Sequence, residues 1–148
     1  MVVAEVLTGI SLVKASVDFI KSNAKCAFLY GYQRPSIEDK YDGKSYISSK
    51  DLRHPIIERI ITDVEYIGND IELNQNGILL YGTNAVGKTS FIRALGIATI
   101  MAQAGLYVPA SSFKYNPYKY IFTRILGNDN IFKGLSTFAV EMSELRTI

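Results

Sequence analysis

The chain has 148 residues, of which 48% are hydrophobic and 20% are charged, a balance typical of a soluble globular domain with one core. Its net charge is +2 and its Lys and Arg residues do not cluster, so we do not expect a dedicated nucleic-acid-binding surface. A single cysteine, Cys26, excludes an internal disulfide, and no run reaches the roughly 18 apolar residues of a membrane span, so we expect an intracellular protein of undetermined compartment.

Residues 2–29 are expected to form one long helix, because apolar side chains recur at steps of three and four. This stripe consists of Val6, Ile10, Val13, Val17, Ile20, Ala24 and Phe28. A stripe of this kind needs an apolar partner, and without one it stays exposed and favours self-association. Residues 31–50 then become polar and rich in turn-forming residues, which predicts a linker or hairpin.

Residues 51–148 are interpreted as an α/β domain. Strands are predicted at 56–61, 64–67, 78–81 and 118–125, with a turn at 74–77. The run at 78–81 is apolar without interruption, as in a central parallel strand that is buried on both faces. Near the end of the chain, Ser136 is a plausible N-cap for a last helix.

The most informative motif follows the run at 78–81 directly and fits the pattern G-x-x-x-x-G-K-[ST]. Its residues are Gly82, Thr83, Asn84, Ala85, Val86, Gly87, Lys88, Thr89 and Ser90. A phosphate chain binds where backbone N–H groups point inward and a helix N-terminus faces the anion, and glycines permit the turn that presents them. Lys88 would reach the β- and γ-phosphates, and the Thr89 hydroxyl would ligate Mg²⁺. The motif predicts a nucleoside-triphosphate site; the alternative is an ordinary glycine turn with Lys88 in solvent.

A helix is predicted to follow this loop from Lys88 to Gln103. Its apolar residues occupy more than one face, so we expect it to be largely buried. Gly96 in its middle suggests close packing against a neighbour, and Gly105 offers a C-cap.

The segments around the loop resemble the MutS family of DNA mismatch-repair ATPases. Besides the loop, the blocks that carry the resemblance are RHPIIE at 53–58, YIGND at 66–70, GLYVPA at 105–110, IFTRI at 121–125 and STFAVEM at 136–142. The loop itself departs from the common family sequence at Thr83, Ala85 and Val86 and in the order of Thr89 and Ser90. It therefore resembles a divergent variant of the family's P-loop, with nothing essential to phosphate binding lost.

The resemblance implies a P-loop NTPase fold of the ABC-ATPase type, with a parallel central sheet preceded by a helical segment. Residues 1–30 resemble the end of the family's core domain, and residues 51–148 resemble the first part of its ATPase domain, without the acidic Walker B strand. It further implies ATP and Mg²⁺ as cofactors, with Tyr66 and Ile67 against adenine. Ser136 would act in trans, at the nucleotide of a second MutS-type ATPase domain in a homo- or heterodimer. Mismatched double-stranded DNA would bind through regions absent from this chain, which alone would bind ATP without sustained turnover.

Several residues have a second interpretation. Tyr66 could simply pack on a sheet edge, and Ser136 could be a plain N-cap. His54, the single histidine, could act as a general base, but without a carboxylate spaced beside it a structural role is favoured. Glu141 could end a Walker B strand, as it would in an unrelated P-loop enzyme such as a small-molecule kinase, although the segment also fits a helix. A further alternative is a nucleotide-binding interaction module without hydrolysis, or an inactive truncated product.

Overall fold

The computed structural model describes residues 2–38, 43–61, 63–83 and 86–123. The chain divides into two units, of which the first spans Met1–Tyr118 and the second begins at Lys119. In the second unit, the rings of Tyr120 and Phe122 stack with centroids 5.9 Å apart, and the Lys119 ammonium lies 5.2 Å from the centroid of the Tyr120 ring. All helices and strands described below belong to the first unit.

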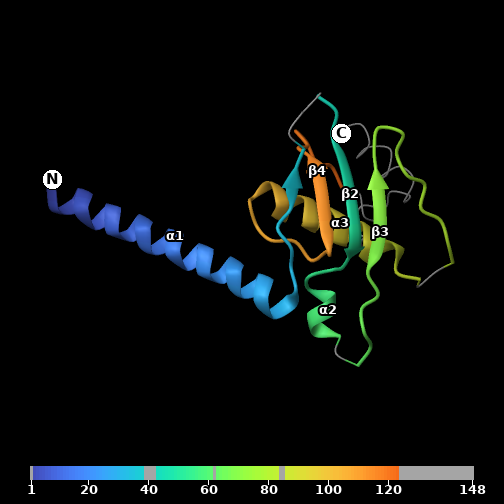
Figure 1. Ribbon diagram of the computed structural model, residues 1–148, viewed down its shortest axis with the longest axis horizontal. Coiled ribbons are helices and arrows are strands. Elements are labelled where there is room, and N and C mark those ends of the chain that lie inside the picture. The colour runs from blue at the N-terminus through green and yellow to red at the C-terminus, as the bar shows by residue number, and fades with distance from the viewer. Residues whose placement is uncertain (1, 39–42, 62, 84–85, 124–148) are drawn as a thin grey trace, which may run out of the picture. The chain divides into compact units, whose positions relative to one another are not determined.

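A four-stranded mixed sheet forms the centre of the first unit, with strand order β1-β4-β2-β3 (Figure 1). The strands are β1 Ser36–Ile37, β2 Tyr46–Leu52, β3 Asn69–Leu73 and β4 Ser112–Asn116. The two-residue β1 runs parallel to β4, whereas β2 is antiparallel to both β3 and β4. The α/β class is therefore as predicted, but the described strands do not form the expected parallel sheet.

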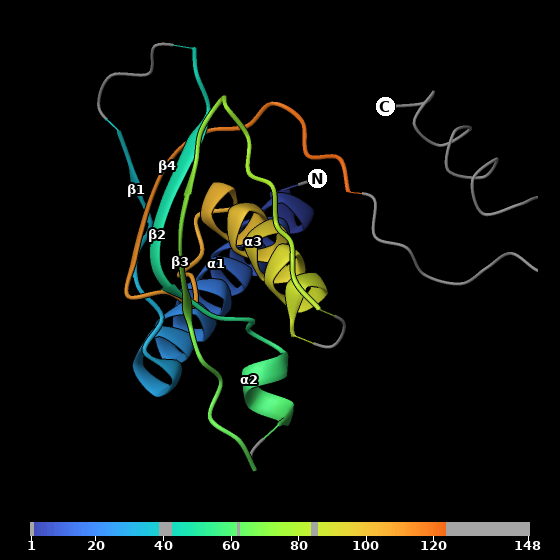
Figure 2. The same ribbon diagram turned by 90° about the vertical axis from the view of Figure 1, so that its right-hand side faces the viewer.

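Helix α3, Lys88–Gln103, crosses one face of this sheet (Figure 2). Its buried face is lined by small side chains, including Ala98 and Ala102, which let the helix approach the strands closely. The sheet contributes Ile47, Leu52, Ile71, Phe113 and Tyr115 to the same core. The Tyr115 hydroxyl donates to the carbonyl of Ala102 at 3.0 Å, so this buried polar group is satisfied where helix and sheet meet.

The predicted bounds of α3 are confirmed, and so is its cap. Gly105 has φ +76°, its N–H donates to Ala102, and the N–H of Leu106 donates to Met101. These two bonds form a Schellman motif, which satisfies the carbonyls that a helix end leaves free. The expectation of a largely buried helix was wrong for the described residues, because Ile92 and Ile100 on the outer face are exposed. Among the described residues, no atom outside the backbone of the helix itself lies within 4 Å of where a Cβ of Gly96 would be, so Gly96 marks no close contact there.

Helix α1, Val2–Tyr30, confirms the predicted N-terminal helix. Its stripe is exposed at Ile10, Val13, Val17, Ile20 and Phe28, as a helix without an apolar partner requires. Polar contacts fasten its last turns to the sheet domain: Asn23 bonds to the backbone of Gly105 and Tyr107, and Arg53 donates to the Tyr30 carbonyl. No described helix is long and apolar enough to span a membrane.

The predicted strands at 56–61 and 64–67 are wrong, since the first segment contains a short helix, α2 Ile57–Ile60, and the second contains no strand. The cause lies just before the helix. The Nδ1 atom of His54 accepts hydrogen bonds from the N–H groups of Ile56 and Ile57, at 3.2 and 3.3 Å. This side chain therefore accepts hydrogen bonds from amides that a helix start leaves without partners. An extended strand would not present such a pair of free amides.

The apolar run at 78–81 is not a strand either, and its side chains are exposed, Leu79 by 86% and Leu80 by 40%. A strand needs a hydrogen-bonded neighbour, and none of the described segments pairs with this one. The strand predicted at 118–125 is absent over its described part, 118–123, and β4 lies before it at Ser112–Asn116. The segment 31–50, predicted to be a linker or hairpin, contributes β1 and most of β2 to the sheet.

Candidate functional site

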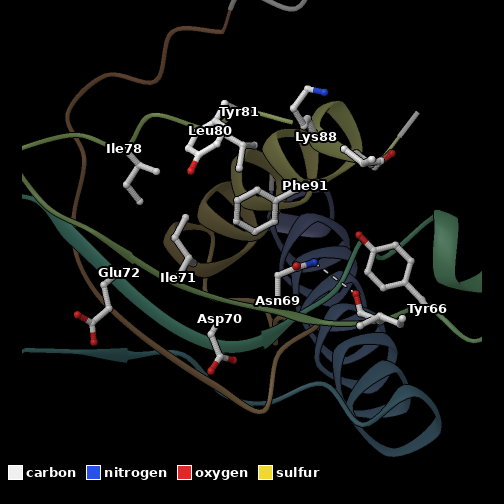
Figure 3. Close-up of a pocket in the computed structure, with 14 residues that line it drawn as sticks. Tyr66, Asn69, Asp70, Ile71, Glu72, Ile78, Leu80, Tyr81, Lys88 and Phe91 are labelled. Carbon is white, nitrogen blue, oxygen red and sulfur yellow. Dashed lines mark hydrogen bonds between the residues drawn. The ribbon is translucent and has the colours of Figure 1, made fainter. Parts of the chain in front are cut away.

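A cavity of about 550 Å³ opens between β3, the exposed run at 78–81 and the start of α3 (Figure 3). Its walls come from segments well separated in the sequence. The lining residues are Tyr66, Ile67, Asn69, Asp70, Ile71, Glu72, Ile78, Leu80, Tyr81, Val86, Gly87, Lys88, Ser90 and Phe91. The structure thus brings the turn at 66–67 and the end of the glycine loop to one cavity.

One end of the cavity is the N-terminus of α3. Gly87 precedes the helix with φ +89° and ψ +9°, a left-handed conformation that favours glycine, and the first helical bond runs from Phe91 N–H to the Gly87 carbonyl. The N–H groups of the first turn therefore have no partner within the helix, and the helix dipole favours a negative charge there. The chemistry of this end suits an anion.

The Lys88 ammonium lies over the glycine loop and is bound by it. It donates to the carbonyl of Gly82 at 2.7 Å and to the carbonyl of Thr83. Both acceptors are backbone atoms, and Lys88 forms no ion pair with a carboxylate of the described residues. Gly82 also leaves room for the loop, because a Cβ at this position would lie 3.3 Å from Cγ2 of Val86.

The other end of the cavity is formed by the turn that leads into β3. The Tyr66 ring is half-buried and faces the cavity (Figure 3), and Ile67 is a further lining residue. The Asn69 amide donates to the Ile67 carbonyl at 3.3 Å, which ties the turn to the first residue of the strand. Burial, and next the nearby charge of Glu58, raise the pKa of the Tyr66 hydroxyl, so the ring remains neutral. This end offers an aromatic face beside an aliphatic side chain.

Asp70 and Glu72 on β3 are also among the residues at the cavity wall, but their carboxylates point to the side of the strand opposite that of Ile71, away from the cavity (Figure 3). The sequence analysis assigned no role to either. Their spacing was the available signal, because residues two apart on a strand lie on the same face. Asp70 is held by two donors, the backbone N–H of Asp51 and the ammonium of Lys50, both at 2.9 Å. These hydrogen bonds lower the pKa of the Asp70 carboxyl, that from Asp51 most.

The predicted site residues fall into three groups. Those that line the cavity are Tyr66, Ile67, Val86, Gly87, Lys88 and Ser90. Those described but not lining it are Gly82, Thr83 and Thr89. Those outside the described residues are Asn84, Ala85 and Ser136, together with Glu141. The magnesium role of Thr89 and the role of Ser136 in trans therefore remain predictions.

His54 is buried, and both hydrogen bonds that its Nδ1 atom accepts come from the backbone. Burial lowers the pKa of its imidazole, and the charge of Arg93 acts in the same direction. These contacts support the structural role. Among the described residues, no group of three or more His, Cys, Asp or Glu side chains could hold a metal ion.

Comparison with known proteins gives one consistent family. The family model for MutS domain V matches residues 78–148. A mutS homologue of Acanthamoeba polyphaga mimivirus is 40% identical over 168 residues, which cover 90% of this chain and 15% of the relative. A mitochondrial mutS homologue of Sarcophyton glaucum is 41% identical, over 89% of this chain and 14% of the relative. The MutS protein of Symbiobacterium thermophilum is 38% identical, over 90% and 15%. The chain thus spans only a small part of these relatives.

Proposed function

Because this chain belongs to the MutS family, we propose that it binds ATP as the nucleotide-binding segment of a MutS-type DNA mismatch-repair ATPase. One observation carries the proposal: Tyr66 and Lys88, 22 positions apart, line the same cavity. One end has an aromatic face for a base and the other has a cation and a helix N-terminus for phosphates.

The size and lining of the cavity support a nucleotide. Its volume of about 550 Å³ lies within the range of about 300–1,000 Å³ that is usual for small-molecule and cofactor sites. Apolar walls of Ile67, Leu80 and Phe91 alternate with a few charged groups, as in sites that bury a base and orient it by polar contacts. A small inorganic anion alone would leave the base end empty.

We assign the residues as follows. Tyr66 and Ile67 bind adenine, and the loop 82–90 surrounds the phosphates. Lys88 exchanges the carbonyls of Gly82 and Thr83 for phosphate oxygens, which are stronger acceptors because they are charged. When bound, ATP would supply a phosphoanhydride bond, whose hydrolysis in the whole protein would drive changes between its domains. Thr89 would hold Mg²⁺, and Thr89→Val should remove the dependence of ATP affinity on Mg²⁺ while leaving weak binding without the ion.

The proposal extends to partners in the whole protein. A second MutS-type ATPase domain would close over the nucleotide with Ser136, and mismatched double-stranded DNA would bind through other domains. The nucleotide state would then be coupled to DNA handling in the dimer. The relatives that match this chain are named as DNA mismatch-repair proteins. These names support the assignment.

The direct test is a calorimetric titration of the chain with ATP, GTP and tripolyphosphate in the presence of Mg²⁺. ATP should bind more tightly than tripolyphosphate, because ATP has a base to occupy the Tyr66 end and tripolyphosphate has none. Absence of ATP binding by a folded chain would refute the proposal. Equal affinity for ATP and tripolyphosphate would refute the assignment of the base end.

A further inference from the structure

Strand β2 contains a bulge beside the turn that carries Tyr66. Ser49 pairs with Ile71 and Leu52 with Asn69, so three steps along β2 match two steps along β3. The extra residue lies at Lys50 or Asp51, and Asp51 has φ +51°. Among the described residues, no other non-glycine has a positive φ. A bulge of this kind bends the strand and needs specific contacts to hold it.

Asp70 supplies those contacts from β3. Its Oδ1 accepts the backbone N–H of Asp51 and its Oδ2 accepts the ammonium of Lys50, each at 2.9 Å. One carboxylate therefore holds both residues of the bulge. The bond to Asp51 is made to the backbone, so it fixes the path of the chain and not only a side chain.

Gly68 packs directly on this bulge. A Cβ at Gly68 would lie 1.9 Å from Oδ1 of Asp51 and 2.9 Å from its backbone carbonyl carbon. The side-chain oxygen could rotate away, but the backbone carbon could not move without the bulge. The turn at 66–68 therefore rests on Asp51, and any shift of the bulge displaces Tyr66 and Ile67 with it.

The residues after the bulge are anchored in the core. Leu52 is fully buried, and the N–H of Arg53 donates to the carbonyl of Pro109 at 2.8 Å. The bulge thus links the core on one side to the cavity wall on the other. A well-packed core resists displacement, so the part of the cavity wall that is linked to it through the bulge is also held in place.

We propose that Asp70 is a positioning residue for the nucleotide base: by holding the bulge at Lys50 and Asp51, it fixes the turn at 66–68 where the Tyr66 ring meets adenine. This inference rests on the proposed ATP site. It assigns to Asp70 a role in the affinity for the base and none in the affinity for phosphates.

A purely electrostatic role predicts the opposite sign. Asp70 and Glu72 both lie on the strand beside a cavity that is proposed to take a polyphosphate, and both carboxylates point to the other side of that strand (Figure 3). If their charge alone mattered, removing either would strengthen the binding of ATP, because like charges repel. Positioning predicts that the loss of Asp70 weakens ATP binding, whereas the loss of Glu72 does not.

The test compares Asp70→Ala with the matched variant Glu72→Ala by titration with ATP and with tripolyphosphate. Asp70→Ala should weaken ATP binding by about threefold to tenfold, the range for an aromatic stacking contact, and should not weaken tripolyphosphate binding. Glu72→Ala should tighten both ligands slightly. ATP affinity that is unchanged or higher in Asp70→Ala would overturn the proposal, as would an equal loss for both ligands.

Two additional variants separate the possible failures. Lys88→Ala should abolish the binding of both ligands. If ATP binding depends on Lys88 but not on Asp70, the positioning role is refuted, whereas the proposed ATP site is not. Thermal unfolding shows whether each variant folds. If Asp70→Ala does not fold, Asp70→Asn replaces it, because the amide oxygen still accepts from Asp51 while the charge facing Lys50 is lost. Asp70→Asn should then show a smaller, still ATP-selective loss, and no loss would overturn the proposal.

Discussion

The two ends of the cavity differ in what holds them. The base end, which carries Tyr66 and Ile67, packs on the bulge of β2. Leu52, the residue that follows the bulge, is fully buried. The phosphate end follows the exposed run at 78–81, and its Lys88 ammonium is bound to carbonyls of its own loop. One end is thus an extension of the core, whereas the other is held by local contacts.

This difference indicates how the two ends would meet a ligand. A wall anchored in the core is preorganised, so little conformational entropy is lost when a base stacks on it. The loop must instead exchange its internal hydrogen bonds for bonds to phosphate. Changes at the phosphate end should therefore alter affinity and leave folding intact, whereas changes at the base end should alter both.

The largest effect on binding should come from Lys88→Ala. Truncating one partner of a charged hydrogen-bonded pair costs about 2–5 kcal/mol or more, which should abolish measurable ATP binding. Because Lys88 is half-buried and, among the described residues, donates to carbonyls of its own loop, the unfolding temperature should hardly change. Titration with a fluorescent ATP analogue, alongside circular dichroism, measures both quantities.

Lys114 provides the matched control. It is an exposed lysine on β4, and it does not line the cavity. Lys114→Ala removes the same charge and should leave ATP affinity unchanged. An equal loss in both variants would mean that net charge, and not the position of Lys88, governs binding.

The largest effect on stability should come from Leu52→Ala at the base end. Removing a fully buried leucine side chain costs about 2–5 kcal/mol of unfolding free energy, and Leu52 is 0% exposed. Urea denaturation measures this loss. If Leu52→Ala remained as stable as the native chain, the base end would not depend on the core as described.

A smaller effect is expected at Tyr66. Tyr66→Ala should weaken ATP binding by about 1 kcal/mol, whereas Tyr66→Phe should be nearly neutral, because the ring face makes the contact. Neither variant should change the binding of tripolyphosphate. Equal losses for Ala and Phe in an ATP titration would instead assign the contact to the hydroxyl.

The smallest effect concerns pH. Burial lowers the pKa of His54 below its ordinary value of 6.5, so the unfolded chain takes up the proton first as pH falls. The stability that His54 contributes is therefore complete above pH 6.5 and decreases as pH falls from there toward the folded pKa. Thermal unfolding between pH 7.5 and 5 should show this decrease in the native chain. In His54→Asn, which keeps an acceptor without titrating, the same range should show a weaker dependence.

Local signals in the sequence predicted the elements whose ends are set locally. Helix α3, the cap at Gly105 and the turn at 74–77 follow from such signals, and the Asn74 side chain indeed accepts the N–H of Asn76 in that turn. The candidate site was predicted in part for the same reason, because the glycine loop and the turn at 66–67 are both local motifs. Their convergence on one cavity required the fold.

The sequence could not reveal features that depend on distant partners. The run at 78–81 has the composition of a central strand, but composition does not supply the neighbouring strand that would pair with it. The segment 56–61 is rich in isoleucine, which favours a strand by composition, but the hydrogen bonds to His54 mark a helix start there. The bulge at Asp51 has no sequence signal at all, since its holding carboxylate lies on another strand.

The half-buried position of Tyr66 has a practical consequence for optical measurements. The chain contains no tryptophan, so Tyr66→Trp would place its single indole at the wall of the cavity. An indole stacks on a base at least as well as a phenol does. Its emission, excited beyond the absorption of the 10 tyrosines, would report on the arrival of a base without any label on the nucleotide.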